Sequence, residues 1–84
     1  MLIIDERNKV TLNLNYISSF YPSGKRLYFW LPDEDGEPYH TQYNSEEQAQ
    51  KAWQSLNLRI KNAARLQTVA IHVPTPEELK GELP

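Results

Sequence analysis

The chain has 84 residues, no cysteine and nearly balanced charge, with nine Lys and Arg against eleven Asp and Glu and a formal net charge of -2 at pH 7. A domain of this length buries only about 60 to 65 % of the surface that its unfolded chain exposes, so its core is marginal. The absence of cysteine excludes disulfides, thiolate zinc sites and cysteine nucleophiles, which leaves oligomerisation as a means of stabilisation and favours a homodimer. The charge balance lacks the basic excess that is typical of duplex-binding domains.

Compartment and domain count follow from what the chain lacks. No apolar run approaches the roughly 20 residues that a membrane span needs, and residues 1–5 are too short and too acidic at their flank for a signal peptide. We therefore expect a cytoplasmic protein without a membrane contact. No internal repeat or low-complexity tract divides the chain further.

The N-terminal third indicates short strands. Residues 2–5 are the first candidate, and residues 10–14 alternate apolar and polar side chains with the period of two that is typical of a strand with one buried face. Asn15 interrupts this alternation, which indicates a bulge or bend before a second extended piece over 17–21.

A turn over 22–24 leads into the strongest strand of the sequence, at 25–31, because proline presets φ and glycine tolerates positive φ. Alternation in this strand separates apolar positions on one face from Arg26, Tyr28 and Trp30 on the other. After a charged loop, residues 39–43 return as the next strand. The pattern predicts an antiparallel meander whose inner face carries Val10, Leu12, Leu14, Leu27 and Phe29.

The clearest local signal is a capped amphipathic helix from Ser45 to about Leu66. Ser45 can accept a hydrogen bond from the backbone of Gln48, whose side chain can bond back, and two glutamates place negative charge at the positive end of the helix dipole. Apolar residues recur at three- and four-residue steps as one stripe: Ala49, Ala52, Trp53, Leu56, Ile60 and Ala63. We expect the helix to lie across the sheet with Trp53 and Leu56 at the centre.

The C-terminal region adds two short pieces. Residues 68–73 alternate as a strand ended by proline, which needs a sheet edge in its own chain or in a partner chain, and Thr75 with Pro76 predicts one or two helical turns. The fold class is therefore α+β: a small antiparallel meander of about four strands packed on one long amphipathic helix, with a short C-terminal strand. Residues 1–74 form the single domain and residues 75–84 a tail.

The chain lacks the residue patterns of common catalytic and metal sites. His40 and His72 have no second ligand at a metal-binding spacing, so we expect both on strand surfaces. The serines lack a nucleophile-elbow context, and the glycines stand too far apart for a phosphate loop. The acidic loop around Gly36 does not fit a calcium loop, since Leu31 stands where the first carboxylate ligand belongs. We expect neither enzymatic activity nor a metal or cofactor.

The outward face of the strongest strand combines aromatic rings with arginine. Tyr28 and Trp30 are expected side by side, flanked by Arg26. Further neighbours come from the next strand: His40, Tyr39 or Tyr43. Arginine and aromatic residues are enriched at protein interfaces, and aromatic sheet faces also stack unpaired bases. Three explanations are open: other parts of the monomer cover these rings, the rings bind protein, or they bind nucleic acid.

The preferred hypothesis is a small non-enzymatic protein-protein interaction module, a self-associating accessory or inhibitor-type protein of bacterial or phage character. Its interaction face is expected to consist of Arg26, Tyr28, Trp30 and His40. The alternative is a single-stranded nucleic-acid-binding protein in which the aromatic rings stack bases. Its phosphate contacts would be Lys25, Arg26, Arg59, Lys61 and Arg65. The net negative charge argues against nucleic acid.

Overall fold

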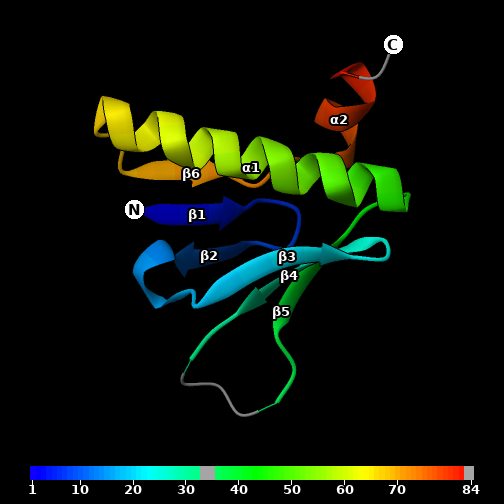
Figure 1. Cartoon of the computed structure of the whole chain (residues 1–84), viewed down its shortest axis with the longest axis horizontal. Helices are drawn as coiled ribbons and strands as arrows, with labels where there is room; N and C mark the ends of the chain where they lie inside the picture. The colour runs from blue at the N-terminus through cyan, green and yellow to red at the C-terminus, as the bar shows by residue number, and fades with distance from the viewer. Residues whose placement is uncertain (33–35, 83–84) are drawn as a thin grey trace.

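The computed structural model describes residues 1–32 and 36–82, in which five strands precede the long helix and one more strand and a short helix follow it (Figure 1). In chain order the elements are β1 (Leu2–Asp5), β2 (Val10–Asn13), the 3-10 helix η1 (Leu14–Tyr16), β3 (Ser19–Ser23), β4 (Arg26–Trp30), β5 (Tyr39–Gln42), α1 (Glu46–Leu66), β6 (Ala70–His72) and α2 (Pro76–Glu82). The expected α+β class is confirmed, with an antiparallel meander, one long helix, a later strand and a short C-terminal helix.

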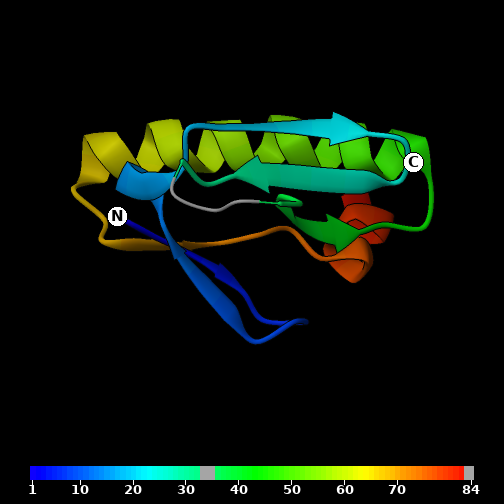
Figure 2. The same ribbon diagram turned by 90° about the horizontal axis from the view of Figure 1, so that it is seen from below.

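The strands form two three-stranded sheets, β2-β1-β6 and β3-β4-β5, where the sequence predicted one meander. The chain leaves the first sheet at η1, where the Asn13 side chain accepts a hydrogen bond from the Asn15 N–H and ends the extended backbone. The expected interruption near Asn15 is thus confirmed, as a 3-10 turn. It lets β1 and β2 run in a different direction from β3 and β4 (Figure 2), so Val10 and Leu12 do not share a sheet with Leu27.

The hairpin between β3 and β4 turns later than predicted. Pro22 lies within β3, opposite Leu27, and the turn is made by Gly24 and Lys25. Gly24 has a φ of +59°, the left-handed conformation that glycine adopts without a steric cost. Pro22 is tolerated because β3 is an edge strand, whose outward N–H positions need no partner in the sheet.

Helix α1 begins and ends where the sequence predicts. The Ser45 Oγ accepts a hydrogen bond from the Gln48 N–H (3.1 Å), and the Gln48 side chain accepts one from the Asn44 N–H (3.0 Å). At the other end, Gln67 is left-handed and the Thr68 N–H donates to the Ala63 carbonyl (2.9 Å), which closes the helix with a Schellman-type bond.

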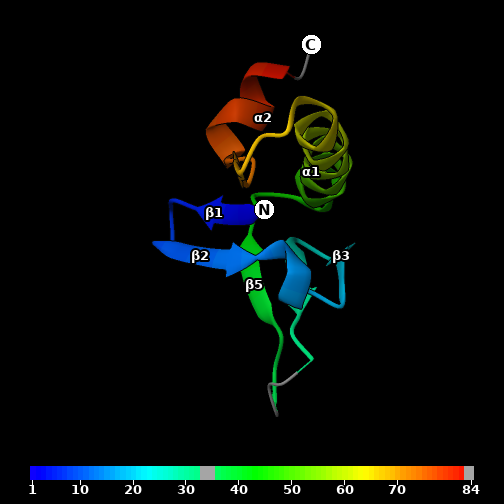
Figure 3. The ribbon, with the colours of Figure 1, turned by 90° about the vertical axis from the view of Figure 1, so that its left-hand side faces the viewer.

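The segment after α1 returns to its own chain. Strand β6 runs parallel to β1, with Ile71 opposite Ile3, so it needs no sheet edge from a partner. Residues 76–82 form α2, as the capping pattern predicts, and the Thr75 Oγ1 accepts a hydrogen bond from the Glu78 N–H (3.2 Å). Figure 3 shows α2 beside α1. Leu79 of α2 is fully buried, so this part of the expected tail contributes to the core.

The core lies between α1, the inner face of β3-β4-β5 and the sheet around β1. Its buried hydrophobic residues are Ile3, Leu27, Phe29, Tyr43, Ala49, Ala52, Leu56, Ala63, Ile71, Val73 and Leu79. The apolar stripe of α1 is confirmed, with Leu56 fully buried at its middle, but Trp53 is only partly buried and packs at the margin. Leu12 and Leu14 are also only partly buried, because Leu12 lies on β2, an edge strand of the first sheet, and Leu14 lies in η1.

Candidate interaction site

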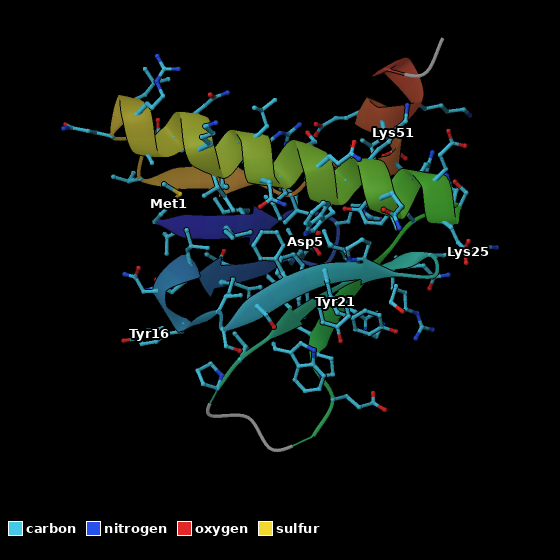
Figure 4. All side chains as sticks on the ribbon, in the orientation of Figure 1. Met1, Asp5, Tyr16, Tyr21, Lys25 and Lys51 are labelled. Atoms are coloured by element: carbon cyan, nitrogen blue, oxygen red, sulfur yellow. The ribbon has the colours of Figure 1, made fainter. Side chains whose placement is uncertain are left out.

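The outer face of β3-β4-β5 is built by strand alternation. In β4, Leu27 and Phe29 are fully buried against the core, so Tyr28 and Trp30 project to the opposite side. The register places Tyr21 of β3 and His40 of β5 on either side of Tyr28. We call the set Tyr21, Tyr28, Trp30 and His40 the aromatic face. Tyr21 lies on the side of β3 that is turned away from α1 (Figure 4).

The side chains of the aromatic face hold one another in place. The rings of Tyr21 and Tyr28 are stacked, with centroids 5.9 Å apart, and the Tyr28 and His40 rings are 5.6 Å apart. The Trp30 Nε1 donates a hydrogen bond of 2.8 Å to the Tyr21 Oη. These contacts fix the ring orientations before any partner binds, so binding would not have to order them.

The described part of the chain leaves this face open. Tyr21 is 40 % exposed and Trp30 is 37 % exposed. The rings line a hollow of about 250 Å³ together with Arg26, Glu37 and Pro38. Strand β6 pairs with β1, and α2 packs against α1, so neither of these C-terminal elements covers the rings. The explanation that the C-terminal region shields them within the monomer therefore fails for the described residues.

The structure brings His40 to the aromatic face but turns two other candidate tyrosines inward. The Tyr39 ring packs against Phe29 (5.9 Å between centroids), because strand register puts Tyr39 on the core side of β5. Tyr43 is 2 % exposed, and its hydroxyl donates to the Pro74 carbonyl (2.7 Å). Sequence analysis missed Tyr21. A turn at residues 24–25 gives the register in which Tyr21 lies opposite Tyr28, and this register would have identified Tyr21 as part of the face.

The basic candidates do not form one surface. Arg59 is already engaged: its Nη1 donates to the His72 carbonyl (2.8 Å), and its Nη2 pairs with the Glu78 carboxylate. Lys25 lies in the β3–β4 turn near the N-terminal end of α1 (Figure 4). Lys61 lies 15 residues after Glu46, the first residue of the helix, or roughly 22 Å along it at a rise of about 1.5 Å per residue. Arg65, one turn further on, increases that separation.

A second polar cluster, which sequence analysis missed, joins the two sheets at the turn after β1. Asp5 is 3 % exposed and accepts hydrogen bonds from the Tyr39 hydroxyl (2.5 Å) and the Asn8 side-chain amide (2.9 Å). The Arg7 guanidinium donates to the Thr41 Oγ1 (2.6 Å) and to the carbonyl that follows it along β5 (2.8 Å). We call Asp5, Arg7, Asn8, Tyr39 and Thr41 the sheet junction.

The chemistry of the sheet junction is structural. Burial, followed by the hydrogen bond to Asp5, raises the pKa of Tyr39 to about 12. Burial also raises the pKa of Tyr43, over whose ring the Arg7 guanidinium lies at 5.1 Å from the centroid. Every buried side-chain polar atom among the described residues has a hydrogen-bond partner. The cluster therefore anchors β5 to the β1–β2 turn and holds the sheet that carries the aromatic face.

Neither a metal-binding cluster nor a membrane-spanning helix is found in the described residues, and similarity to known proteins points to no further site. In residues 1–32 and 36–82, no group of three or more His, Cys, Asp or Glu side chains is arranged to hold a metal ion. No helix in the described part is both long and apolar enough to cross a bilayer. Comparison of the chain with protein-family models, curated proteins and solved structures finds no match.

Proposed function

We propose that the protein is a small, non-enzymatic protein-protein interaction module of the cytoplasm, which self-associates and acts as an accessory or inhibitor-type protein of bacterial or phage character. The observation that carries the proposal is the aromatic face: two tyrosines, a tryptophan and a histidine that orient one another on the outer face of a sheet, with Tyr21 and Trp30 exposed. Tryptophan, tyrosine and arginine are the residues that most often dominate binding energy at protein interfaces.

Two features support a protein partner over other ligands. The hollow at the aromatic face, at about 250 Å³, is smaller than the roughly 300 to 1,000 Å³ typical of small-ligand pockets, which suits a surface contact better. The sheet junction and the fully buried residues behind β4 keep the face in one conformation, which lowers the ordering cost of association.

The alternative of single-stranded nucleic-acid binding shares the exposed rings, since any base can stack on them. The structure offers no continuous basic surface for the phosphates, because Arg59 is bonded within the chain and Lys61 and Lys25 lie at different ends of α1. The net charge of -2 adds repulsion of phosphate.

Replacement of Trp30 tests the proposal. The Trp30→Ala variant should stay folded, because the ring is exposed and bonded only to Tyr21 on the same face, and it should lose self-association. Leu58→Ala is the matched control: Leu58 is 59 % exposed on α1, away from the aromatic face. Sedimentation velocity of the wild type and both variants at micromolar concentration, at about 50 and 500 mM salt, measures the outcome. Because apolar burial is expected to carry most of the association, the wild type should still self-associate at the higher salt concentration.

The same samples separate protein from nucleic acid. A labelled single-stranded oligonucleotide should give no anisotropy change at about 150 mM salt, where surface charges are screened beyond about 8 Å. Submicromolar oligonucleotide binding that weakens steeply with salt, together with a monomeric wild type, would overturn the proposal in favour of the alternative.

A further inference from the structure

The aromatic face carries opposite charges at its two ends. Arg26 stands at the start of β4 beside the hairpin turn, and its Nη1 lies 3.5 Å from the Tyr28 hydroxyl. Glu37 lies at the other end, next to Pro38, and both line the same hollow as Trp30. The four residue steps from Arg26 to Trp30 span roughly 13 Å of extended strand. The face is therefore positive at one end, aromatic in the middle and negative at the other end.

Neither charge is neutralised within the described part of the chain. Arg59 pairs there with Glu78, and His72 contacts Glu6, both away from the aromatic face. Arg26 and Glu37 are exposed, and the exposed rings lie between them. A surface complementary to this face would be aromatic, with an acid opposite Arg26 and a base opposite Glu37. A second copy of the same face, reversed along the strand direction, has this composition: its Glu37 lies opposite Arg26 and its Arg26 lies opposite Glu37.

We propose that the aromatic face binds the same face of a second copy. The two copies form a two-fold dimer whose axis lies in the interface, perpendicular to β4, and crosses this strand at Tyr28. The inference rests on the proposed function and specifies its geometry. A two-fold axis across the strand reverses the second β4, so that Arg26 of each copy meets the end that carries Trp30 and Glu37 in the other. An axis along the strand would instead set arginine against arginine, which is repulsive.

The antiparallel arrangement also suits the aromatic rings. Tyr21, Tyr28 and His40 are in register across the three strands, so an axis through Tyr28 along this row brings each ring opposite its own copy. Two sheets packed face to face lie about 10 Å apart, a distance that opposed aromatic side chains fill. Arg26 would lie over the indole of Trp30 as well as beside Glu37, which adds a cation–π contact at each end.

Charge reversal at the two ends tests this geometry. Arg26→Glu leaves an acid at both ends of the face, and Glu37→Arg leaves a base at both ends. Each variant alone should dimerise about a hundredfold more weakly than the wild type, because like charges then meet at both ends of the interface. An equimolar mixture of the two variants should recover the dimer, since every contact is then between opposite charges. The double variant Arg26→Glu with Glu37→Arg should also dimerise by itself.

Sedimentation velocity with one variant fluorescently labelled measures each species, and circular dichroism verifies the fold. Lys61→Glu changes the net charge by the same amount as Arg26→Glu, at an exposed position on α1, and should dimerise normally. If Trp30→Ala abolishes the dimer but charge reversal does not weaken it, this geometry is wrong while the proposed function stands. If the dimer survives Trp30→Ala, or the wild type is monomeric at micromolar concentration, both fall.

Discussion

At the scale of single residues, alternation along β4 decides which side chains pack in the core and which lie on the outer face of the sheet. Phe29 is fully buried and packs between Phe20 and Tyr39, with ring centroids 5.8 and 5.9 Å away. Its sequence neighbours Tyr28 and Trp30 lie on the opposite side of the sheet, where both contact Tyr21. One strand of five residues thus separates the core from the aromatic face.

Adjacent alanine substitutions in β4 should therefore differ strongly in cost. Phe29→Ala should lower the free energy of unfolding by about 3 to 5 kcal/mol, because it leaves a cavity in a small core. Tyr28→Ala should cost roughly 1 kcal/mol, since its ring is partly exposed. Urea titrations followed by circular dichroism measure both values. A larger loss for Tyr28→Ala would mean that the faces of β4 are assigned the wrong way round.

At the scale of elements, α1 is defined by its ends as much as by its apolar stripe. Ser45 and Gln48 satisfy N–H groups at the N-terminus, and Gln67 ends the helix with a φ of 56°. Left-handed backbone is unfavourable for a residue with a Cβ by roughly 1 to 2 kcal/mol. The helix end therefore holds a local strain that the Thr68 to Ala63 hydrogen bond offsets.

Glycine at the end of α1 should relieve this strain. Gln67→Gly should raise the free energy of unfolding by about 0.5 kcal/mol or more, the steric gain less the backbone entropy that glycine loses on folding. Gln54→Gly is the matched control, because Gln54 is exposed inside the same helix, where glycine should cost about 1 kcal/mol. Thermal melts of the two variants should move in opposite directions, and a loss of stability at both positions would contradict the prediction.

At the scale of the whole molecule, the two sheets are held together by α1 and by the sheet junction. The Tyr39 to Asp5 hydrogen bond links β5 to β1, and Arg7 reaches from the turn after β1 to Thr41. These contacts fix the meander, and with it the aromatic face, relative to the rest of the fold. The junction also makes stability depend on the protonation of a phenol.

Alkaline pH should weaken the junction. The pKa of Tyr39 is raised from 10.0 to about 12, mainly by burial, so the folded state holds this proton more tightly than the unfolded state. Its contribution to stability is complete below pH 10 and is lost as the pH rises through about 12. Urea titrations between pH 8 and pH 11 should show a smaller loss of stability for Tyr39→Phe than for the wild type. Tyr16→Phe, at an exposed ring, should behave as the wild type does.

The sequence predicted the elements whose signals are local. The cap at Ser45, the stripe of α1, the two faces of β4 and the strand at β1 all follow from residues within a few positions of one another, and the structure confirms them. The sequence predicts the turn between β3 and β4 too early, because proline is more common in turns than in strands. An edge strand accepts proline, and whether a strand lies at an edge depends on the whole sheet.

What the sequence determined by itself was composition and periodicity: an α+β chain without cysteine, with a strand that separates apolar from aromatic side chains. Only the tertiary structure decided that the strands form two sheets, that β6 returns to β1, and that Arg59 is bonded within the chain. It also brought Tyr21 to the aromatic face and built the sheet junction from residues more than 30 positions apart. These arrangements are contacts between segments that lie far apart in the sequence. Such a contact depends on where the other strands and helices lie, so a pattern of neighbouring residues does not predict it.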